Sequence, residues 1–251
     1  MANPILDKFA IQLFSVRDSF NKDPRDTLKK VKELGYSGVE IAGFASLTPE
    51  EFKAACDEEG LEIYSIHGGK ENFTEEAFGH LINEMKATGC TRFVYAWLPH
   101  FDSIEPVKQV CEDFKKYAAM LNEYGFEFFF HNHGNDLFII DGEKSVIEYI
   151  MEQVPEMYIE LDTGWCNYGG NESCSFIEKY HDRIKLIHLK QLDGYGDIKI
   201  TELPNGNVID VPPIVEVCKK HGIDQFIVEQ DNTDKLDLES AKINANYLLG
   251  R

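Results

Sequence analysis

Hydrophobic residues gather in eight short runs that are separated by longer stretches with a helical pattern. The runs are Phe9–Phe14, Gly38–Ala42, Glu62–His67, Arg92–Trp97, Glu127–His133, Met157–Thr163, Ile184–Lys190 and Gln225–Gln230. Each is rich in Val, Ile, Phe or Tyr, and several are almost continuously apolar, which is typical of strands covered on both faces of a parallel sheet. We therefore predict eight strands.

The stretches between these runs carry helix start and stop signals. Asp23-Pro24 opens the first helix, and Gly35 closes it. Thr48-Pro49 followed by two acids opens the second, because a capping hydroxyl, a first-turn proline and acidic residues all suit a helix N-terminus. Further helices are predicted from Thr74 to Gly89, from Ser103 to Gly125, from Glu143, from Ser173, from Pro212 to Gly222 and from Asp237 to Leu249.

Eight strand–helix units in 251 residues predict an α/β fold, a (β/α)₈ TIM barrel that forms a single domain over residues 1–251. An open doubly wound sheet is the competing architecture. Its phosphate-binding G-x-G-x-x-G after the first strand is absent here. The longest irregular stretch, Gln191 to Val211, follows a late strand and is expected to form a lid or wall of a site.

The net charge of the chain limits the classes of partner that it is expected to bind. The chain has 25 basic and 44 acidic residues, a formal net charge of −19. Such a surface repels phosphate backbones and anionic lipid headgroups, so neither nucleic acid nor a membrane is expected as a partner. The N-terminal sequence shows no signal peptide and no run is long enough to span a bilayer, so a cytoplasmic location is expected. The six cysteines form no C-x-x-C pair and are expected to be reduced.

Polar side chains follow the apolar bodies of the last four strands. In a barrel of this type the site lies where the strands end. Alternate residues of a strand share a face, so the following pairs can point together into the mouth: His131 with His133, Glu160 with Asp162, and His188 with Lys190. Glu229 ends the eighth strand. Such a mixture of nitrogen and oxygen donors suits one divalent ion, Mn²⁺, Zn²⁺, Co²⁺ or Mg²⁺.

Each of these residues also has an ordinary structural explanation. A lone histidine at a strand end is usually a hydrogen-bonded rim residue, and Asp162 could equally cap the turn that begins at Thr163-Gly164. Four such residues on four successive strands favour a metal site. The earlier strands add Gln12, Glu40, His67 and Trp97 as candidate substrate-binding residues. For Glu40 a helix cap, and for Trp97 core packing, is the alternative.

At these residues the chain resembles the xylose-isomerase-like superfamily of sugar phosphate isomerases and epimerases, whose barrel is also that of the second family of apurinic endonucleases. The similarity spans nearly the whole chain. It is carried by Ile11–Asp18, Leu34–Glu40, His131-Asn132-His133, Leu161-Asp162-Thr163-Gly164-Trp165, His188-Leu189-Lys190 and Val228-Glu229-Gln230-Asp231. Together these segments are specific, although each one alone is weak.

The resemblance implies a metal held by Glu, Asp, His and Glu from strands five to eight. The matching residues are His131, Asp162, His188 and Glu229, so the first position departs from the family pattern. Epimerases of the superfamily pass a proton between two metal-bound glutamates. Here Glu229 remains as a base, with His131 or His133 as its catalytic partner, because histidine can bind metal and exchange protons.

The resemblance also implies a carbohydrate substrate, which we expect Trp165 and Lys190 to contact beside the residues of the earlier strands. The first hypothesis is an isomerase or epimerase that moves a proton next to a metal-polarised carbonyl. The alternative is a lyase, dehydratase or keto-glycoside-cleaving enzyme. An apurinic endonuclease would need a basic groove, and a non-catalytic sugar-binding barrel would not need Glu229. The identity of the sugar, of the metal and of the oligomer stays open.

Overall fold

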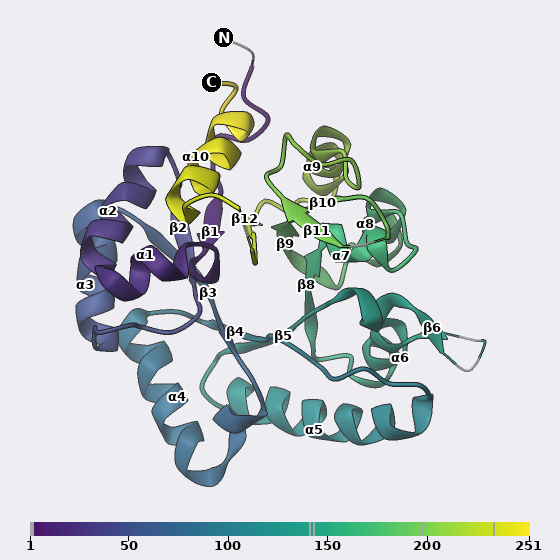
Figure 1. The fold of residues 1–251 in the computed structure, drawn as a ribbon. Helices are drawn as coiled ribbons and strands as arrows, with labels where there is room; N and C mark the ends of the chain where they lie inside the picture. Colours follow the sequence, from purple (N-terminus) through teal and green to yellow (C-terminus); the bar gives the residue numbers. More distant parts are fainter. Residues whose placement is uncertain (1–2, 141, 143, 197, 233) are drawn as a thin grey trace.

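Eight parallel strands close into a barrel that the helices surround (Figure 1). The computed structural model describes residues 3–140, 142, 144–196, 198–232 and 234–251. Around the barrel the strand order is β1-β12-β9-β8-β5-β4-β3-β2, so neighbours in the chain are neighbours in the barrel. The predicted single-domain (β/α)₈ barrel is confirmed.

Seven of the eight barrel strands are shorter than the apolar runs that predicted them, and β3 is one residue longer. The strands are β1 (Ala10–Gln12), β2 (Gly38–Ile41), β3 (Glu62–Gly68), β4 (Arg92–Tyr95), β5 (Glu127–His131), β8 (Tyr158–Asp162), β9 (Ile184–Leu189) and β12 (Phe226–Val228). The runs extend further because residues that follow a strand in the mouth are apolar or site-forming as well. Trp97, for example, lies beyond the end of β4.

Ten helices are found in the part of the chain that the structure describes. They are α1 (Arg17–Lys22), α2 (Pro24–Leu34), α3 (Pro49–Glu59), α4 (Glu75–Thr88), α5 (Ile104–Asn122), α6 (Val146–Gln153), α7 (Thr163–Tyr168), α8 (Ser173–Tyr180), α9 (Val211–Lys220) and α10 (Asp237–Leu248). The sequence signals act as expected: Thr48 and Glu51 form a reciprocal capping box on α3. Gly35 ends α2 with a φ of 106°, a left-handed conformation that a side chain would disfavour.

Three local expectations were wrong. The short helices α1 and α7 were not predicted, because each lies within six residues of a strand or another helix and has no periodic pattern of its own. The stretch after β9 is not irregular throughout: β10 (Gln191–Asp193) and β11 (Lys199–Thr201) pair antiparallel. The helix predicted from Glu143 begins at Val146 instead, because Ser145 caps it, and Glu143 itself lies outside the described residues. A second small ribbon joins β6 (Ile139–Ile140) to β7 (Lys144–Ser145).

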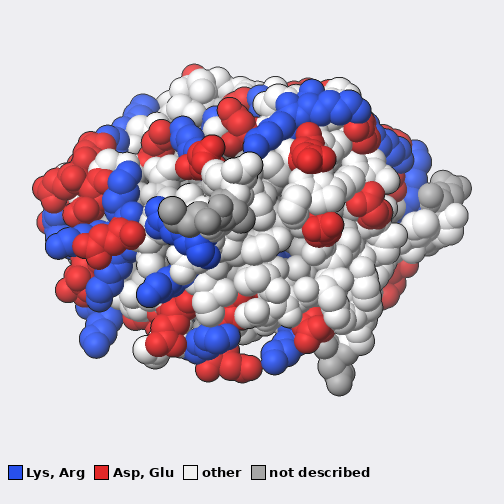
Figure 2. Space-filling view, turned by 90° about the horizontal axis from the view of Figure 1, so that it is seen from above, with Lys and Arg blue, Asp and Glu red and all other residues white. Residues whose placement is uncertain are grey.

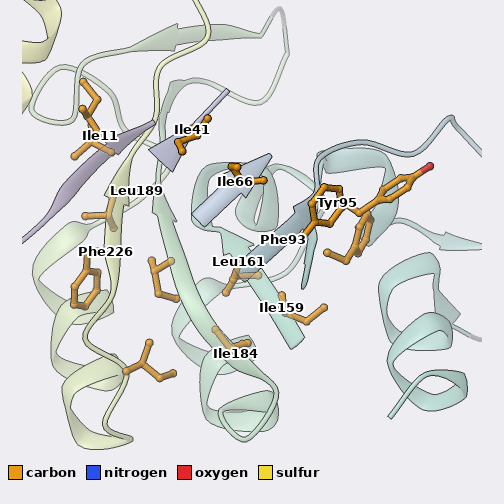
Figure 3. Packing of buried hydrophobic residues seen from close by; sticks show 14 of the residues in the cluster. Ile11, Ile41, Ile66, Phe93, Tyr95, Ile159, Leu161, Ile184, Leu189 and Phe226 are labelled. Atoms are coloured by element: carbon orange, nitrogen blue, oxygen red, sulfur yellow. The ribbon is translucent and has the colours of Figure 1, made fainter. Parts of the chain in front are cut away.

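The core has two layers. Side chains that point out of the barrel pack between strands and helices, as Figure 3 shows for Ile11, Phe93, Leu161 and Phe226. A smaller cluster fills the barrel interior and consists of Ala10, Tyr64, Val94, Phe129, Leu186 and Ile227. Above this plug the inward positions become polar. The apolar plug therefore closes the barrel from below and leaves the site at the carboxyl ends of the strands.

The visible surface carries charges of both signs. On the face shown in Figure 2, Lys and Arg lie interspersed with Asp and Glu. All six cysteines are free thiols, and five of them are buried. Among the described residues, no helix combines the length and the apolar character needed to cross a membrane.

Candidate functional site

The side chains at the carboxyl ends of β5, β8 and β9, with Glu229 after β12, meet inside the barrel mouth. His131 follows the inward Phe129 by two residues, and His188 follows the inward Leu186 in the same way. Neighbouring strands bring His131 beside Glu160, and Asp162 beside His188, as Cα partners. The alternation of the strands and the closure of the barrel thus bring together residues up to 98 positions apart in sequence, from His131 to Glu229.

The four predicted ligands form one cluster, which we call the mouth quartet: His131, Asp162, His188 and Glu229. Each offers a ligand atom, and these atoms all lie within 4.8 Å of one another. His188 Nδ1 lies 2.9 Å from Glu229 Oε2, and His131 Nε2 lies 3.8 Å from the same oxygen. All four residues are buried. The quartet could hold a divalent ion, since two imidazoles and two carboxylates are an accepted donor set for such metals.

The two carboxylate oxygens of Asp162 have different surroundings. Its Oδ1 accepts a hydrogen bond of 2.8 Å from the backbone N–H of Trp165 and caps α7. Its Oδ2 is buried and accepts no hydrogen bond from the described residues, and Lys190 Nζ lies 3.2 Å from it as an ion-pair partner. A buried carboxylate oxygen needs such positive charge nearby, and this one keeps a lone pair available for a metal ion. The cap and the metal-ligand explanations of Asp162 are thus compatible, because each uses a different oxygen, and the residues present fit a metal ion.

Lys190 adds a buried positive charge beside the mouth quartet. Its Nζ lies 2.9 Å from Glu229 Oε2, 3.2 Å from Asp162 Oδ2 and 3.0 Å from Asp231 Oδ2. The side chain is fully buried, and its Nζ lies 5.2 Å from the Trp165 ring centroid. The ammonium balances part of the negative charge of the three carboxylates around it.

A second cluster lies deeper in the barrel and shares two residues with the first. This inner quartet consists of His67, His131, Glu160 and His188, again with ligand atoms within 4.8 Å. Glu160 Oε2 lies 2.7 Å from His67 Nε2, 3.1 Å from His131 Nδ1 and 3.2 Å from His188 Nε2. Its Oε1 is buried without a hydrogen-bond partner among the described residues.

Glu40 borders the inner quartet from β2 and has partners for both oxygens. Ser65 donates to its Oε1, and Gln12 Nε2 donates to its Oε2 over 2.8 Å. His188 Nε2 lies 2.6 Å from the same Oε2. Gln12 is itself fixed because its Oε1 accepts from the backbone N–H of Phe14. Glu40 therefore supports the histidines from inside the barrel and caps no helix.

The protonation of the mouth follows from burial and neighbouring charges. Burial raises the pKa of Glu229, but Lys190 and His188 outweigh it and hold that pKa well below its ordinary range. Burial, assisted by Lys190, lowers the pKa of His133 to about 4. Burial also lowers the pKa of His131 well below its usual value. At neutral pH the side chains alone therefore present an ionised Glu229 beside two neutral imidazoles.

His67 behaves in the opposite way. Burial lowers its pKa, but the carboxylates of Glu40 and Glu160 outweigh that effect and raise the pKa to about 10. Burial raises the pKa of Asp162 to about 6 in spite of Lys190. The site thus separates its titratable groups into charged and neutral ones, a common property of functional sites.

A cavity of about 750 Å³ opens above the two quartets. Its floor includes His67, His131, His133, Glu229 and Asp231, and Gln12 also lines it. Apolar groups also line it: Phe14, Ala42, Tyr95, Trp97 and Pro99. The cavity thus combines polar groups at the candidate ligands with apolar groups, as in many small-molecule sites.

The predicted substrate-binding residues divide into two groups. Gln12, His67 and Trp97 line the cavity, and Trp97 is 59% exposed, so core packing does not explain it. Glu40 and Lys190 are fully buried beneath the cavity, and Trp165 lies behind His133 with ring centroids 5.9 Å apart. These three contact the cavity-lining residues and do not line the cavity themselves.

The sequence placed Glu160 on the mouth-facing side of its strand but gave it no function, and it assigned no function to Ser65 or Asn132. Asn132 joins two strands: its Oδ1 accepts from the Asp162 N–H over 3.0 Å, and its Nδ2 donates to the Asp162 carbonyl over 3.3 Å. The signal for Glu160 was present, because it shares a face of β8 with Asp162, but nothing in the sequence showed that three histidines surround it.

Comparisons with known proteins agree with this geometry. The family model described as "Xylose isomerase-like TIM barrel" matches residues 28–247. An inosose dehydratase of Clostridium perfringens (strain ATCC 13124) is 24% identical over an alignment of 273 positions, which covers 97% of this chain and 87% of that protein. An inosose dehydratase of Bacillus velezensis is 25% identical, with 88% of this chain and 86% of that protein covered.

Among solved structures, a sugar phosphate isomerase/epimerase from Parabacteroides distasonis superposes with a TM-score of 0.79 at 21% identity, covering 98% of this chain and 94% of that one. A probable 3-DHS dehydratase from Bacillus anthracis gives a TM-score of 0.73 at 13% identity, covering 94% and 97%. These likenesses support the fold alone. With the family model matching most of its length, the chain belongs to the xylose isomerase-like TIM barrel family.

Proposed function

We propose that the protein is a metal-dependent lyase that eliminates a group β to the carbonyl of a keto cyclitol or keto sugar. This was the alternative in the sequence analysis, and it now replaces the isomerase or epimerase as the first choice. The observation that carries it is the position of the second candidate base. His131 Nε2 lies 3.8 Å from Glu229 Oε2, and its Nδ1 lies 3.1 Å from Glu160 Oε2.

A two-base epimerase needs a proton donor and a proton acceptor on opposite faces of the substrate. His131 lies beside Glu229, and its other nitrogen is engaged by Glu160 at 3.1 Å. With one nitrogen of His131 toward the metal site and the other toward Glu160, neither is free to act as a second base. Glu229 is then the base, and elimination needs only one.

The curated relatives support the same choice. The two inosose dehydratases match this chain over most of both lengths. At about a quarter identity their name suggests a reaction type for this chain and does not fix its substrate.

Glu229 accepts the proton from the carbon next to the carbonyl, a C=C bond forms, and the bond from the β carbon to its oxygen substituent breaks. The leaving oxygen takes up the proton that Glu229 has accepted and departs as water or as an alcohol, which returns Glu229 to its ionised form. A divalent ion at the mouth quartet would polarise the carbonyl as a Lewis acid. Lys190 keeps Glu229 ionised, and His67 would bind a substrate oxygen from the cavity floor.

The cavity is larger than one sugar ring requires. A volume of about 750 Å³ with an apolar wall leaves room for a substituent on the ring, so a keto glycoside is a candidate substrate beside a free keto cyclitol. Trp97 would face that substituent.

The test uses the purified full chain, stripped of metal and then loaded with Mn²⁺, Co²⁺, Zn²⁺ or Mg²⁺. Inososes and keto glucosides are incubated in D₂O, and the reaction is followed by ¹H NMR and by the ultraviolet absorbance of an enone. A lyase yields an unsaturated ketone and releases water or the aglycone. Deuterium incorporation with an intact ring would instead identify an isomerase or epimerase, and activity unaffected by chelators would remove the metal from the proposal.

A further inference from the structure

The two histidines shared by the quartets each direct one ring nitrogen to the mouth and the other inward. His131 Nε2 faces Glu229 at 3.8 Å, whereas its Nδ1 lies 3.1 Å from Glu160 Oε2. His188 Nδ1 lies 2.9 Å from Glu229 Oε2, whereas its Nε2 lies 3.2 Å from Glu160 Oε2. One carboxylate therefore touches the inward nitrogen of both rings.

A histidine that binds a metal uses the lone pair of one nitrogen and carries its proton on the other. The protonated nitrogen needs an acceptor, which fixes the tautomer and the orientation of the ring. We propose that Glu160 is a positioning residue that accepts an N–H bond from both His131 and His188 and so presents their opposite nitrogens to a metal in the mouth quartet. This inference rests on the metal in the proposed function.

Glu160 is well suited to this role because its own position is rigid. It is fully buried on β8, two residues before the candidate ligand Asp162, and it pairs in register with His131. The strand therefore fixes the separation between the positioning carboxylate and a metal ligand. Glu40 is the nearer acceptor for His188 Nε2, at 2.6 Å against 3.2 Å for Glu160, so two carboxylates share this N–H. None of the hydrogen bonds of Glu40 to described residues involves His131, so Glu160 alone of the two carboxylates contacts both rings.

A different occupant of this region would reverse the roles of the nitrogens. If a cation bound within the inner quartet, Glu160 would be a ligand, and His131 would bind through Nδ1 and His188 through Nε2. The two arrangements share residues but predict opposite tautomers, so one measurement on the unmodified protein separates them.

That measurement is a long-range ¹H–¹⁵N correlation spectrum of the zinc-loaded protein, with His131→Asn and His188→Asn variants used for assignment. We expect the proton of His131 on Nδ1 with zinc on Nε2, and the proton of His188 on Nε2 with zinc on Nδ1. The opposite pattern for either ring, or two zinc ions bound per chain, would overturn the proposal.

A matched pair of variants tests the consequence for the metal. Glu160→Gln keeps the shape of the side chain and removes its charge. Glu202→Gln does the same to a buried carboxylate that accepts bonds from Lys235, Ser240 and Asn205 and belongs to neither quartet. We expect Co²⁺ affinity about 10–100-fold weaker for Glu160→Gln, with a changed visible spectrum of bound Co²⁺, and unchanged affinity for Glu202→Gln.

The outcomes separate the two proposals. Equal affinity and an unchanged Co²⁺ spectrum in folded Glu160→Gln would reject the positioning role while leaving the proposed function standing. A wild-type chain that binds no divalent ion would instead reject the metal itself. Should Glu160→Gln fail to fold, the tautomers of the wild-type protein still decide.

Discussion

Replacing Lys190 by Met tests whether one buried ammonium balances three carboxylates. Methionine has a similar length and no charge, so packing is largely kept while Asp162, Glu229 and Asp231 lose their shared partner at 2.9–3.2 Å. Removing one member of a buried ionic cluster typically costs about 3–5 kcal/mol. We expect the lower end, about 3 kcal/mol, because the freed carboxyls can take up protons.

That loss corresponds to a fall in Tm of about 6–12 °C for a chain of this size. The sign of its pH dependence follows from linkage. In the variant the carboxyls have folded-state pKa values above those of the unfolded chain, so the native state binds more protons and its stability falls as pH rises. The Tm deficit should therefore be larger near pH 8 than near pH 5.

Differential scanning calorimetry of EDTA-treated protein, with and without added Mn²⁺, measures these effects. Since a cation can replace the ammonium, Mn²⁺ should raise the Tm of Lys190→Met more than that of the wild type. Lys179→Met is the control, because the Lys179 side chain is 63% exposed in its ion pair with Glu148. Its replacement should lower the free energy of unfolding by less than about 1 kcal/mol. A metal-free Lys190→Met variant with a Tm within about 2 °C of wild type would refute the idea that the Lys190 ammonium balances the three carboxylates.

Three further changes test the site, and one tests a surface network. Glu229→Gln should lower kcat by about 100-fold or more in a folded protein, and near-normal turnover with metal bound would move the base to His133. His131→Glu would restore the two-glutamate pattern of the family. If the reaction is an elimination, the new carboxylate lies close to Glu229 and should reduce kcat at least about tenfold while metal affinity is kept or increased. Preserved activity would instead favour an epimerase. Trp97→Ala should raise KM about tenfold without lowering Tm. The control, Tyr124→Ala, removes an exposed aromatic side chain after α5 and should leave KM unchanged. Burial raises the pKa of Glu148, but hydrogen bonds from Tyr180, Lys179 and Ser145 outweigh this effect and lower the pKa to about 2. The stability that Glu148 contributes should therefore be lost as pH falls from about 4.5 to 2. Acid titration of Glu148→Gln should lack this contribution to the loss of stability.

The alternation of apolar runs and helical stretches was sufficient to predict the barrel. Most of the runs form strands that are buried on both faces, and glycines or capping residues mark the ends of most helices, so local sequence and global fold agree. The strand ends also identified the mouth quartet, because in a parallel barrel all carboxyl ends meet at one rim. Short elements such as α7 escaped prediction because a six-residue helix depends on its cap and its packing and has no periodic signal.

What surrounds the mouth quartet was decided by the tertiary structure. Between β2 and β3 the register shifts, so Val39 pairs with Ile63 while Glu40 pairs with Ser65. Between β8 and β9 a similar shift pairs Ile159 with Ile184 and Glu160 with Leu186. One residue of shift moves a side chain to the other face of a strand. The sequence shows no sign of either shift, yet the first brings the Ser65 hydroxyl to Glu40.

The burial of Glu160 and Glu40 likewise came from barrel closure. A period of two tells which residues share a face, but only the closed ring determines which faces meet across the interior. Glu160 meets His67 from 93 residues away, and Glu40 meets His188 from 148 residues away. The sequence therefore determined the fold and the residue types at the rim, whereas the three-dimensional closure determined which nitrogen of each histidine faces the mouth.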